Sequence, residues 1–196
     1  MREGSREFTS RRWLWTIVAR FAIVDAVSAA MVNVLGPLLA HSDLSGVRCW
    51  GFIVASYGAG AIVGGLVMTR YRLRRILAAA MLSEPAYSLL LFALAIPLAV
   101  HLDVAAAVLA GGSLEVFNVN SATTMQQEIP ADKLSRVASY DALGNYALTP
   151  VGTAIAGPLA IAFGTRAILT VGGTLVAVLP VLVLVIPEVR HMRRAA

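Results

Sequence analysis

Long apolar blocks dominate this chain. Six of them reach the length of about 20 residues that a helix needs to cross the hydrocarbon layer of a bilayer. They are residues 13–40, 50–68, 76–100, 104–125, 138–161 and 167–186. Apolar and polar positions do not alternate within the blocks as they do in the strands of a membrane barrel, so the pattern predicts six transmembrane helices.

The segments between the blocks are short and polar, and none is long enough to hold a soluble domain. The predicted fold is therefore all-α, a polytopic membrane protein with one six-helix domain. We expect a basic N-terminal segment at residues 1–12, the transmembrane domain at 13–187 and a basic tail at 188–196.

Composition agrees with this class, because 58% of the residues are apolar and only 14% are charged. Soluble domains average roughly half apolar and a quarter charged. The net charge of +5 could indicate nucleic-acid binding, but the basic residues are spread over alternate loops and form no single basic face. We therefore expect the lipid bilayer as the surroundings and no nucleic-acid partner.

The placement of basic residues predicts the orientation. Only Arg48 and Arg166 lie in loops on one side, whereas thirteen basic residues lie on the other. Those thirteen are Arg2, Arg6, Arg11, Arg12, Arg70, Arg72, Arg74, Arg75, Lys133, Arg136, Arg190, Arg193 and Arg194. Cytoplasmic loops carry such an excess, so we expect a multi-pass protein of the inner (plasma) membrane with both termini in the cytoplasm.

Ionisable residues within a membrane are costly and mark functional sites by default. At 1.5 Å per residue, Asp25 and Glu115 lie roughly 18 and 17 Å into the first and fourth blocks, near the middle of the bilayer. Asn33 shares the first block, and Asn118 lies three residues beyond Glu115 on the same helix face. These four residues are candidates for a substrate or proton pathway. The alternative is that they are polar links between helices.

Other polar positions have more ordinary interpretations. We expect Arg20 to extend towards the cytoplasmic surface as an anchor, and Glu84 to be partly hydrated near the inner surface. Pro85 should loosen the third helix. Asp141 lies four residues into the fifth block, where it can meet the helix N-terminus or a loop arginine.

Small residues predict close helix packing. Gly60 and Gly64 are four apart on one face, and the fifth block contains Gly152, Gly157 and Pro158. These residues favour close approach and bending.

Enzyme and metal motifs are missing from the sequence. The single cysteine, Cys49, excludes an internal disulfide and a cysteine-based metal cluster. His41, His101 and His191 all lie outside the predicted helices. The chain has no Gly-x-Ser-x-Gly, His-Glu-x-x-His or phosphate-loop motif. We expect neither enzyme activity nor a cofactor.

Two stretches resemble the major facilitator superfamily, in the second half of its efflux-type members. Residues 126–137, QQEIPADKLSRV, precede Ser139-Tyr140-Asp141, Pro150-Val151-Gly152 and Ala156-Gly157-Pro158, and are similar to the family's loop before its eleventh helix. Residues 64–75, GGLVMTRYRLRR, resemble its basic cytoplasmic motif, with Thr69 where an acidic residue is common. The group is similar to siderophore and macrolide exporters.

The resemblance implies a fold, a function and a partner. The fold would be two inverted three-helix repeats, with the first helix of each repeat, here blocks one and four, lining the substrate cavity. The function would be export of small amphipathic molecules by alternating access. Residues at the cytoplasmic gate would be Arg70, Arg74, Arg75, Arg136 and Asp141. The family has twelve helices, so a second six-helix half is expected, as a homodimer or a separate chain. The alternative is a non-transporting membrane protein that binds a partner subunit.

Overall fold

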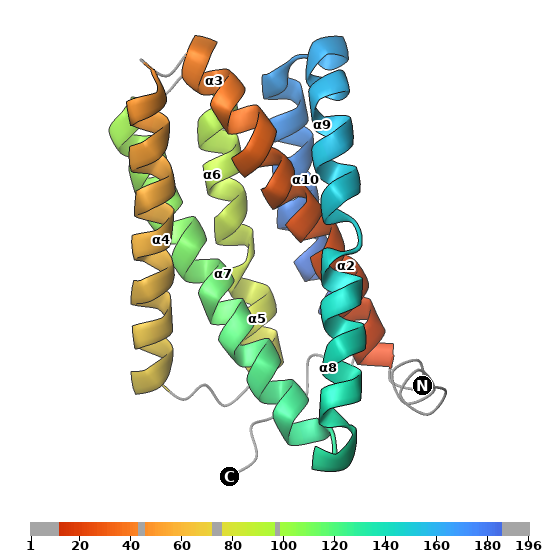
Figure 1. The fold of residues 1–196 in the computed structure, drawn as a ribbon. Helices are drawn as coiled ribbons and strands as arrows, with labels where there is room; N and C mark the ends of the chain where they lie inside the picture. The colour runs from red at the N-terminus through yellow and green to blue at the C-terminus, as the bar shows by residue number, and fades with distance from the viewer. Residues whose placement is uncertain (1–11, 43–45, 72–75, 97–98, 186–196) are drawn as a thin grey trace.

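The structure is a computed structural model that describes residues 12–42, 46–71, 76–96 and 99–185 (Figure 1). All secondary structure in these ranges is helical, and six helical segments are long and apolar enough to span a membrane. They are Trp15–Ser42, Val47–Arg70, Leu77–Ala95, Val100–Glu128, Ala131–Phe163 and Thr165–Val183. The predicted all-α fold with six transmembrane helices is confirmed at this level.

The first span consists of α2 (Arg12–Ala30), a π-helical segment η1 (Met31–Leu35) and α3 (Gly36–Ser42). A π-turn widens the helix and is found frequently at functional sites. Just beyond it, Gly36 lies against the indole of Trp50 at the start of the second span, so closely that a Cβ at Gly36 would collide with the ring. Glycine at this position permits the first and second spans to meet.

The second span, α4 (Val47–Arg70), packs along the fourth, α7 (Val100–Glu128). Glycines make the approach possible. A Cβ on Gly60 would collide with the carbonyl of Val108, and one on Gly64 would lie 2.6 Å from the carbonyl oxygen of Gly112. The predicted close contact through Gly60 and Gly64 is confirmed.

The third span is broken into α5 (Ile76–Ser83) and α6 (Pro85–Ala95). Proline lacks an amide hydrogen and its ring clashes with the preceding turn, so Pro85 begins a new helix. Glu84 lies at the break, as the sequence led us to expect. The Ser83 hydroxyl donates a hydrogen bond to the Ser113 carbonyl oxygen at 3.2 Å, which ties this break to α7.

The fifth span is also broken, into α8 (Ala131–Tyr146) and α9 (Thr149–Phe163), and α10 (Thr165–Val183) follows it. Here the predicted boundaries were wrong. We expected a loop over much of 126–137, but α7 continues to Glu128 and α8 begins at Ala131. Asp141 therefore lies in the second half of α8 and not in a first turn, so it does not meet that helix's N-terminus.

The interior divides into two apolar clusters. One surrounds Met31, Tyr87, Leu91 and Leu169, and joins the middle of α2 to α6 and α10. The other surrounds Phe117 and joins the start of α2 to α5, α7 and α8. Many large apolar side chains face outwards, which suits a surface in contact with lipid. An even number of spans returns the end of α10 to the side of the bundle where α2 begins (Figure 1).

Candidate functional site in the membrane interior

An ion pair joins the first and third spans inside the bundle. The guanidinium of Arg20 on α2 contacts the carboxylate of Glu84 at the α5–α6 break. Both side chains are shielded from solvent, with 2% and 0% of their surfaces exposed. The Arg20 guanidinium carbon also lies 4.5 Å from the ring centroid of Phe117 on α7. One cation thereby connects three spans.

This pair corrects two sequence-based expectations. Arg20 does not extend to the membrane surface, and Glu84 is not partly hydrated, because the two side chains are buried together as an ion pair. Glu84 lies between α5 and α6, at the break in the third span that precedes Pro85. Removing charges from water is costly, and a close opposite charge compensates part of that cost.

Asp25 has a partner on the fifth span. Its Oδ2 accepts a hydrogen bond of 2.8 Å from the Thr149 hydroxyl, at the start of α9. Asp25 is half-buried and lies next to the Ala147–Leu148 break that separates α8 from α9. The carboxylate thus reaches a helix end that the sequence did not predict.

Two tyrosines lie among the first three spans, and one of them is influenced by both deep carboxylates. Tyr57 on α4 is within electrostatic range of both Asp25 and Glu115. Its ring is edge-on to that of Tyr87, with centroids 6.2 Å apart. The Tyr87 hydroxyl donates a hydrogen bond of 2.6 Å to the Ser28 hydroxyl on α2. A series of contacts from Ser28 through Tyr87 to Tyr57 therefore joins the first three spans. We refer to Asp25, Tyr57, Glu115 and Asn118 as the polar face.

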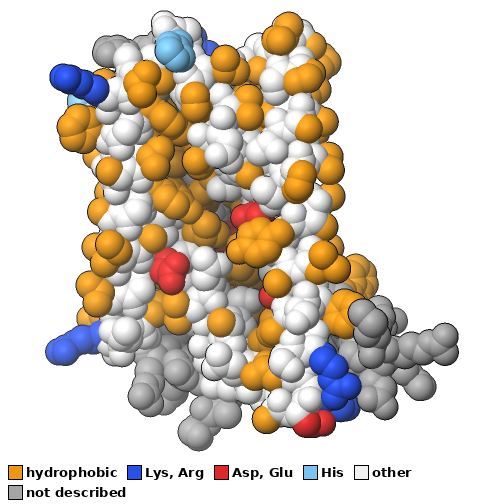
Figure 2. Space-filling view, in the orientation of Figure 1, with side chains coloured by type: hydrophobic (Ala, Val, Ile, Leu, Met, Phe, Trp, Pro, Cys, Tyr) orange, Lys and Arg blue, Asp and Glu red, His pale blue; other side chains and the backbone are white. Residues whose placement is uncertain are grey.

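The polar face is partly open. Asp25, Tyr57 and Glu115 are half-buried and Asn118 is exposed. A Cβ added to Gly65 would lie 3.7 Å from the Cγ of Glu115, so the Glu115 side chain lies against α4. Figure 2 shows acidic side chains at mid-height on a largely hydrophobic or uncharged face, with Lys and Arg only near its two ends.

Asn33 is not joined to the polar face by any hydrogen bond within the described residues. It lies in the π-helical segment, is exposed, and donates to the Ala29 carbonyl oxygen at 2.9 Å. Asn120 is buried and donates to its own helix at Val116, so it belongs to the packing of α7.

The expected gate residues are only partly described. Arg74 and Arg75 lie outside the described residues. Arg70 ends α4 in an exposed position. Arg136 is exposed on α8 and donates to the Asp132 carbonyl oxygen at 3.2 Å. Asp141 is half-buried and has an interaction partner within the protein.

The small residues of α9 differ from one another. A Cβ on Gly152 would lie 2.6 Å from the carbonyl oxygen of Ala26, so α9 and α2 approach closely there. The expected close approach does not hold at Gly157, where a Cβ would meet nothing within 4 Å. Pro158 is exposed within α9, which continues to Phe163.

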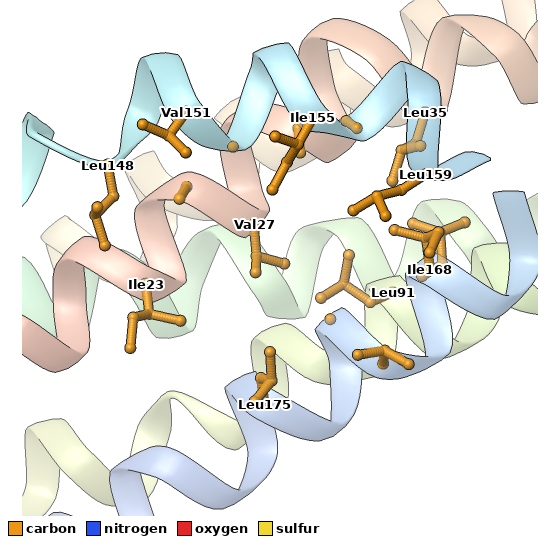
Figure 3. A pocket seen from close by; sticks show the side chains of 17 residues that line it. Ile23, Val27, Leu35, Leu91, Leu148, Val151, Ile155, Leu159, Ile168 and Leu175 are labelled. Carbon is orange, nitrogen blue, oxygen red and sulfur yellow. The ribbon is translucent and has the colours of Figure 1, made fainter. Parts of the chain in front are cut away.

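Pockets open between the helices of the described residues, and two of them bear on the site. One, of about 300 Å³, lies among α2, α6, α9 and α10 and is lined by aliphatic side chains such as Val27, Ile155 and Leu175 (Figure 3). The other, of about 350 Å³, lies among α2, α7 and α8 and includes Asn118 and Asp141. Only the second combines polar and aromatic groups.

Sequence reasoning missed several polar partners. Ser28, Tyr87 and Thr149 resemble ordinary residues of apolar helices, and only the packing of the spans pairs them. Asp103 was also missed, since it precedes the predicted fourth block, yet it is buried in the first turn of α7. Across the described ranges, no three His, Cys, Asp or Glu side chains are grouped so that they could hold a metal ion.

Comparisons with known proteins identify no relative. No family model, no curated protein sequence and no solved structure matches the chain.

Proposed function

We propose that this chain is the six-helix half of a transporter that exports small amphipathic molecules across the inner membrane by alternating access. The observation that carries the proposal is the polar face, where Asp25 and Glu115 stay partly open at the depth of the membrane interior around Tyr57. Partly exposed carboxylates at this depth are costly in lipid, at about 3 kcal/mol each on insertion scales. A water-filled substrate path removes that cost.

The packing of the spans supports a pair of inverted three-helix repeats. In such a pair, spans one, two and three correspond to spans four, five and six. The contact of α4 (span two) with α7 (span four) then corresponds to the contact of the fifth span with α2 (span one). The same correspondence maps the contact between α6 and α10 onto itself. All three contacts are present. Transporters built from such repeats bind substrate near the middle of the bilayer, and the chain's resemblance to the major facilitator superfamily agrees.

Broken helices supply a second line of support. The first span has a π-turn, and the third and fifth spans break at Glu84 and at Ala147–Leu148. Non-helical backbone at membrane depth is tolerated where it borders protein or a water-filled cavity. The break at Ala147–Leu148 lies beside the Asp25 carboxylate, on the side where a substrate would pass.

A second six-helix bundle completes the proposed transporter, because alternating access needs two bundles that rock around a central site. The second bundle is another copy of this chain or a separate chain. The excess of basic residues in alternate loops supports an orientation of the proposed exporter with both termini in the cytoplasm.

Reconstitution into liposomes tests the proposal. Transport of an amphipathic fluorescent dye is measured across a range of protein-to-lipid ratios, together with the number of chains per particle by single-molecule photobleaching. We expect transport only from particles that hold at least two bundles. Dye transport by a particle that holds one chain would refute the half-transporter proposal.

The Glu115→Gln variant tests the role of the polar face. It should abolish transport or uncouple it from a proton gradient without impairing membrane insertion. Asp132→Asn is the matched control, since it makes a similar change at an exposed position on α8. If the wild-type chain forms a stable complex yet shows neither saturable dye binding nor transport, the alternative, a non-transporting protein that binds a partner subunit, is favoured.

A further inference from the structure

The pocket among α2, α7 and α8 has a lining unlike the rest of the bundle. Asn118, Ser121 and Gln126 of α7 line one wall, and Phe21 of α2 lines another. Asn118, Ser121 and the apolar Met125 follow helical spacing, so they form one stripe of α7 that faces the opening, and Gln126 lies beside it. The volume of about 350 Å³ is within the range of roughly 300–1,000 Å³ typical of small-molecule sites.

The amide and hydroxyl groups of this pocket are not used by the protein itself. Within the described residues, the side chains of Asn118, Ser121 and Gln126 make no hydrogen bond. Amide and hydroxyl groups both donate and accept hydrogen bonds. In a membrane such groups need water or a ligand, because leaving them unsatisfied in an apolar medium is costly. They suit hydroxyl, carbonyl and amide groups of a ligand.

Aromatic rings form the apolar side of the pocket. Phe21 and Phe117 are stacked, with centroids 4.9 Å apart and planes 20° from parallel. Phe117 is buried, whereas Phe21 is half-buried and keeps part of its surface towards the pocket. The Arg20 guanidinium lies over Phe117 and holds this ring in place. A flat or cyclic apolar group can pack against the exposed part of this stack.

Formal charge does not favour a charged ligand. Arg20, whose guanidinium lies over the lining residue Phe117, is 3% exposed and is paired with Glu84, so it is not available to an anion. Asp141 lines the pocket, but it already has a partner within the protein. The remaining lining is neutral.

We propose that the pocket of Phe21, Asn118, Ser121 and Gln126 binds a neutral amphipathic molecule with a ring system and a polar edge. The ring packs against Phe21, and the polar edge forms hydrogen bonds with Asn118, Ser121 and Gln126 of α7. This inference rests on the proposed function, for which it names the substrate class and a binding position near the end of the bundle where α7 meets α8.

Binding to the single chain in lipid nanodiscs tests the inference. The probe is N-phenyl-1-naphthylamine, which is neutral, and the matched anionic probe is 8-anilino-1-naphthalenesulfonate. A rhodamine ester serves as the cationic probe, and empty nanodiscs give the background of each. We expect saturable binding of the neutral probe only. Equal or tighter binding of either charged probe would overturn the assignment of a neutral ligand.

Substitutions locate the site. Ser121→Phe fills the pocket and should weaken binding of the neutral probe by about tenfold or more, which is about 1.4 kcal/mol. Leu109→Phe, at an exposed position of the same helix outside the pocket, should leave binding unchanged. Val151→Phe, in the aliphatic pocket of Figure 3, should also leave it unchanged. Loss of binding in Val151→Phe, or none in Ser121→Phe, would overturn the proposed location.

Two milder substitutions distinguish a loss of binding from a loss of folding. Asn118→Leu and Gln126→Leu remove hydrogen-bonding groups from exposed positions, and each should weaken binding severalfold with an unchanged melting temperature. Unchanged affinity in both would also contradict the inference.

The proposed function and the proposed pocket can be contradicted independently of each other. A chain that binds the neutral probe but never transports contradicts only the transport proposal. Transport that is unaffected by Ser121→Phe contradicts only the pocket.

Discussion

Arg20 and Glu84 form a buried ion pair between the first and third spans, and Phe117 of the fourth span lies against the guanidinium. The pair is placed by two features of the chain. Pro85 breaks the third span next to Glu84, and α2 carries Arg20 on the side that faces this break. Each charge has no opposite partner in its own segment and is neutralised only when the fold brings the first and third spans together.

A double-mutant cycle measures this pair. Arg20→Met or Glu84→Met alone should destabilise the protein by about 3–5 kcal/mol, because each leaves a buried charge without its partner. The double variant should cost much less than the sum of the two, since both charges are then gone. The measurement is unfolding in mixed micelles followed by circular dichroism. Additive losses would mean that the two side chains do not interact.

The sequence predicted the spans well, because each depends on a local property. Blocks of apolar residues reach membrane length, Pro85 interrupts the third, and the spacing of Gly60 and Gly64 marks the seam with α7. Such signals need only neighbours along the chain or around one helix. The boundaries were less accurate at 126–137, where polar residues continue α7 and begin α8 as helices that extend past the apolar blocks.

The site was less predictable, because it depends on which spans meet. Asp25 and Glu115 stood out by depth alone. That Thr149 would donate a hydrogen bond to Asp25, or that Tyr57 would lie within electrostatic range of both carboxylates, follows only from the packing of α2, α4, α7 and α9. Arg20 could equally have extended to the surface, since its long side chain permits either arrangement.

Glycine substitutions test the close helix contacts with matched controls. Gly60→Ala should destabilise the bundle by about 1–3 kcal/mol, because the new methyl group collides with the Val108 carbonyl. Gly58→Ala, two residues earlier, meets nothing within 4 Å and should be neutral or slightly stabilising. Thermal melting in detergent compares the two. Equal losses would show that α4 and α7 do not pack through Gly60.

The same comparison applies to α9. Gly152→Ala should destabilise the protein because its methyl group would press on the Ala26 carbonyl, whereas Gly157→Ala has open space. A difference of about 1 kcal/mol or more is expected between the two. If Gly157→Ala were the more harmful change, the position of α9 against α2 would be wrong.

Reporter fusions test the orientation. Fusions after Arg75, after Pro130 and at Ala196 should read as cytoplasmic, because thirteen basic residues lie on that side. Fusions near Ser45 and Gly164 should read as external. Replacing Arg72, Arg74 and Arg75 together by Asn gives a variant in which the bias is weaker and mixed orientation is expected. An external signal at Ala196 in the wild-type chain would rule out six spans.

The sign of charge on the polar face predicts how bundles associate. Asp25 and Glu115 are negative when ionised, and the nearby positive charge of Arg20 is held by Glu84 in the interior. Two identical faces would place carboxylates opposite carboxylates in a medium of low polarity, where like charges repel strongly. A face with lysines should bind the wild-type face more tightly than the wild-type face binds itself.

Three pairings of labelled chains in liposomes make this measurable by energy transfer. One chain is wild type and the other carries Asp25→Lys and Glu115→Lys. The mixed pair should associate at least about tenfold more tightly than either like pair. A copy with Asp132→Lys, outside the membrane interior, should behave as wild type. Insertion of each variant is checked by size exclusion, since lysine at this depth costs about as much as the aspartate it replaces. If all three pairings associate equally, the charged face is not where bundles meet, and the partner of this chain must dock elsewhere.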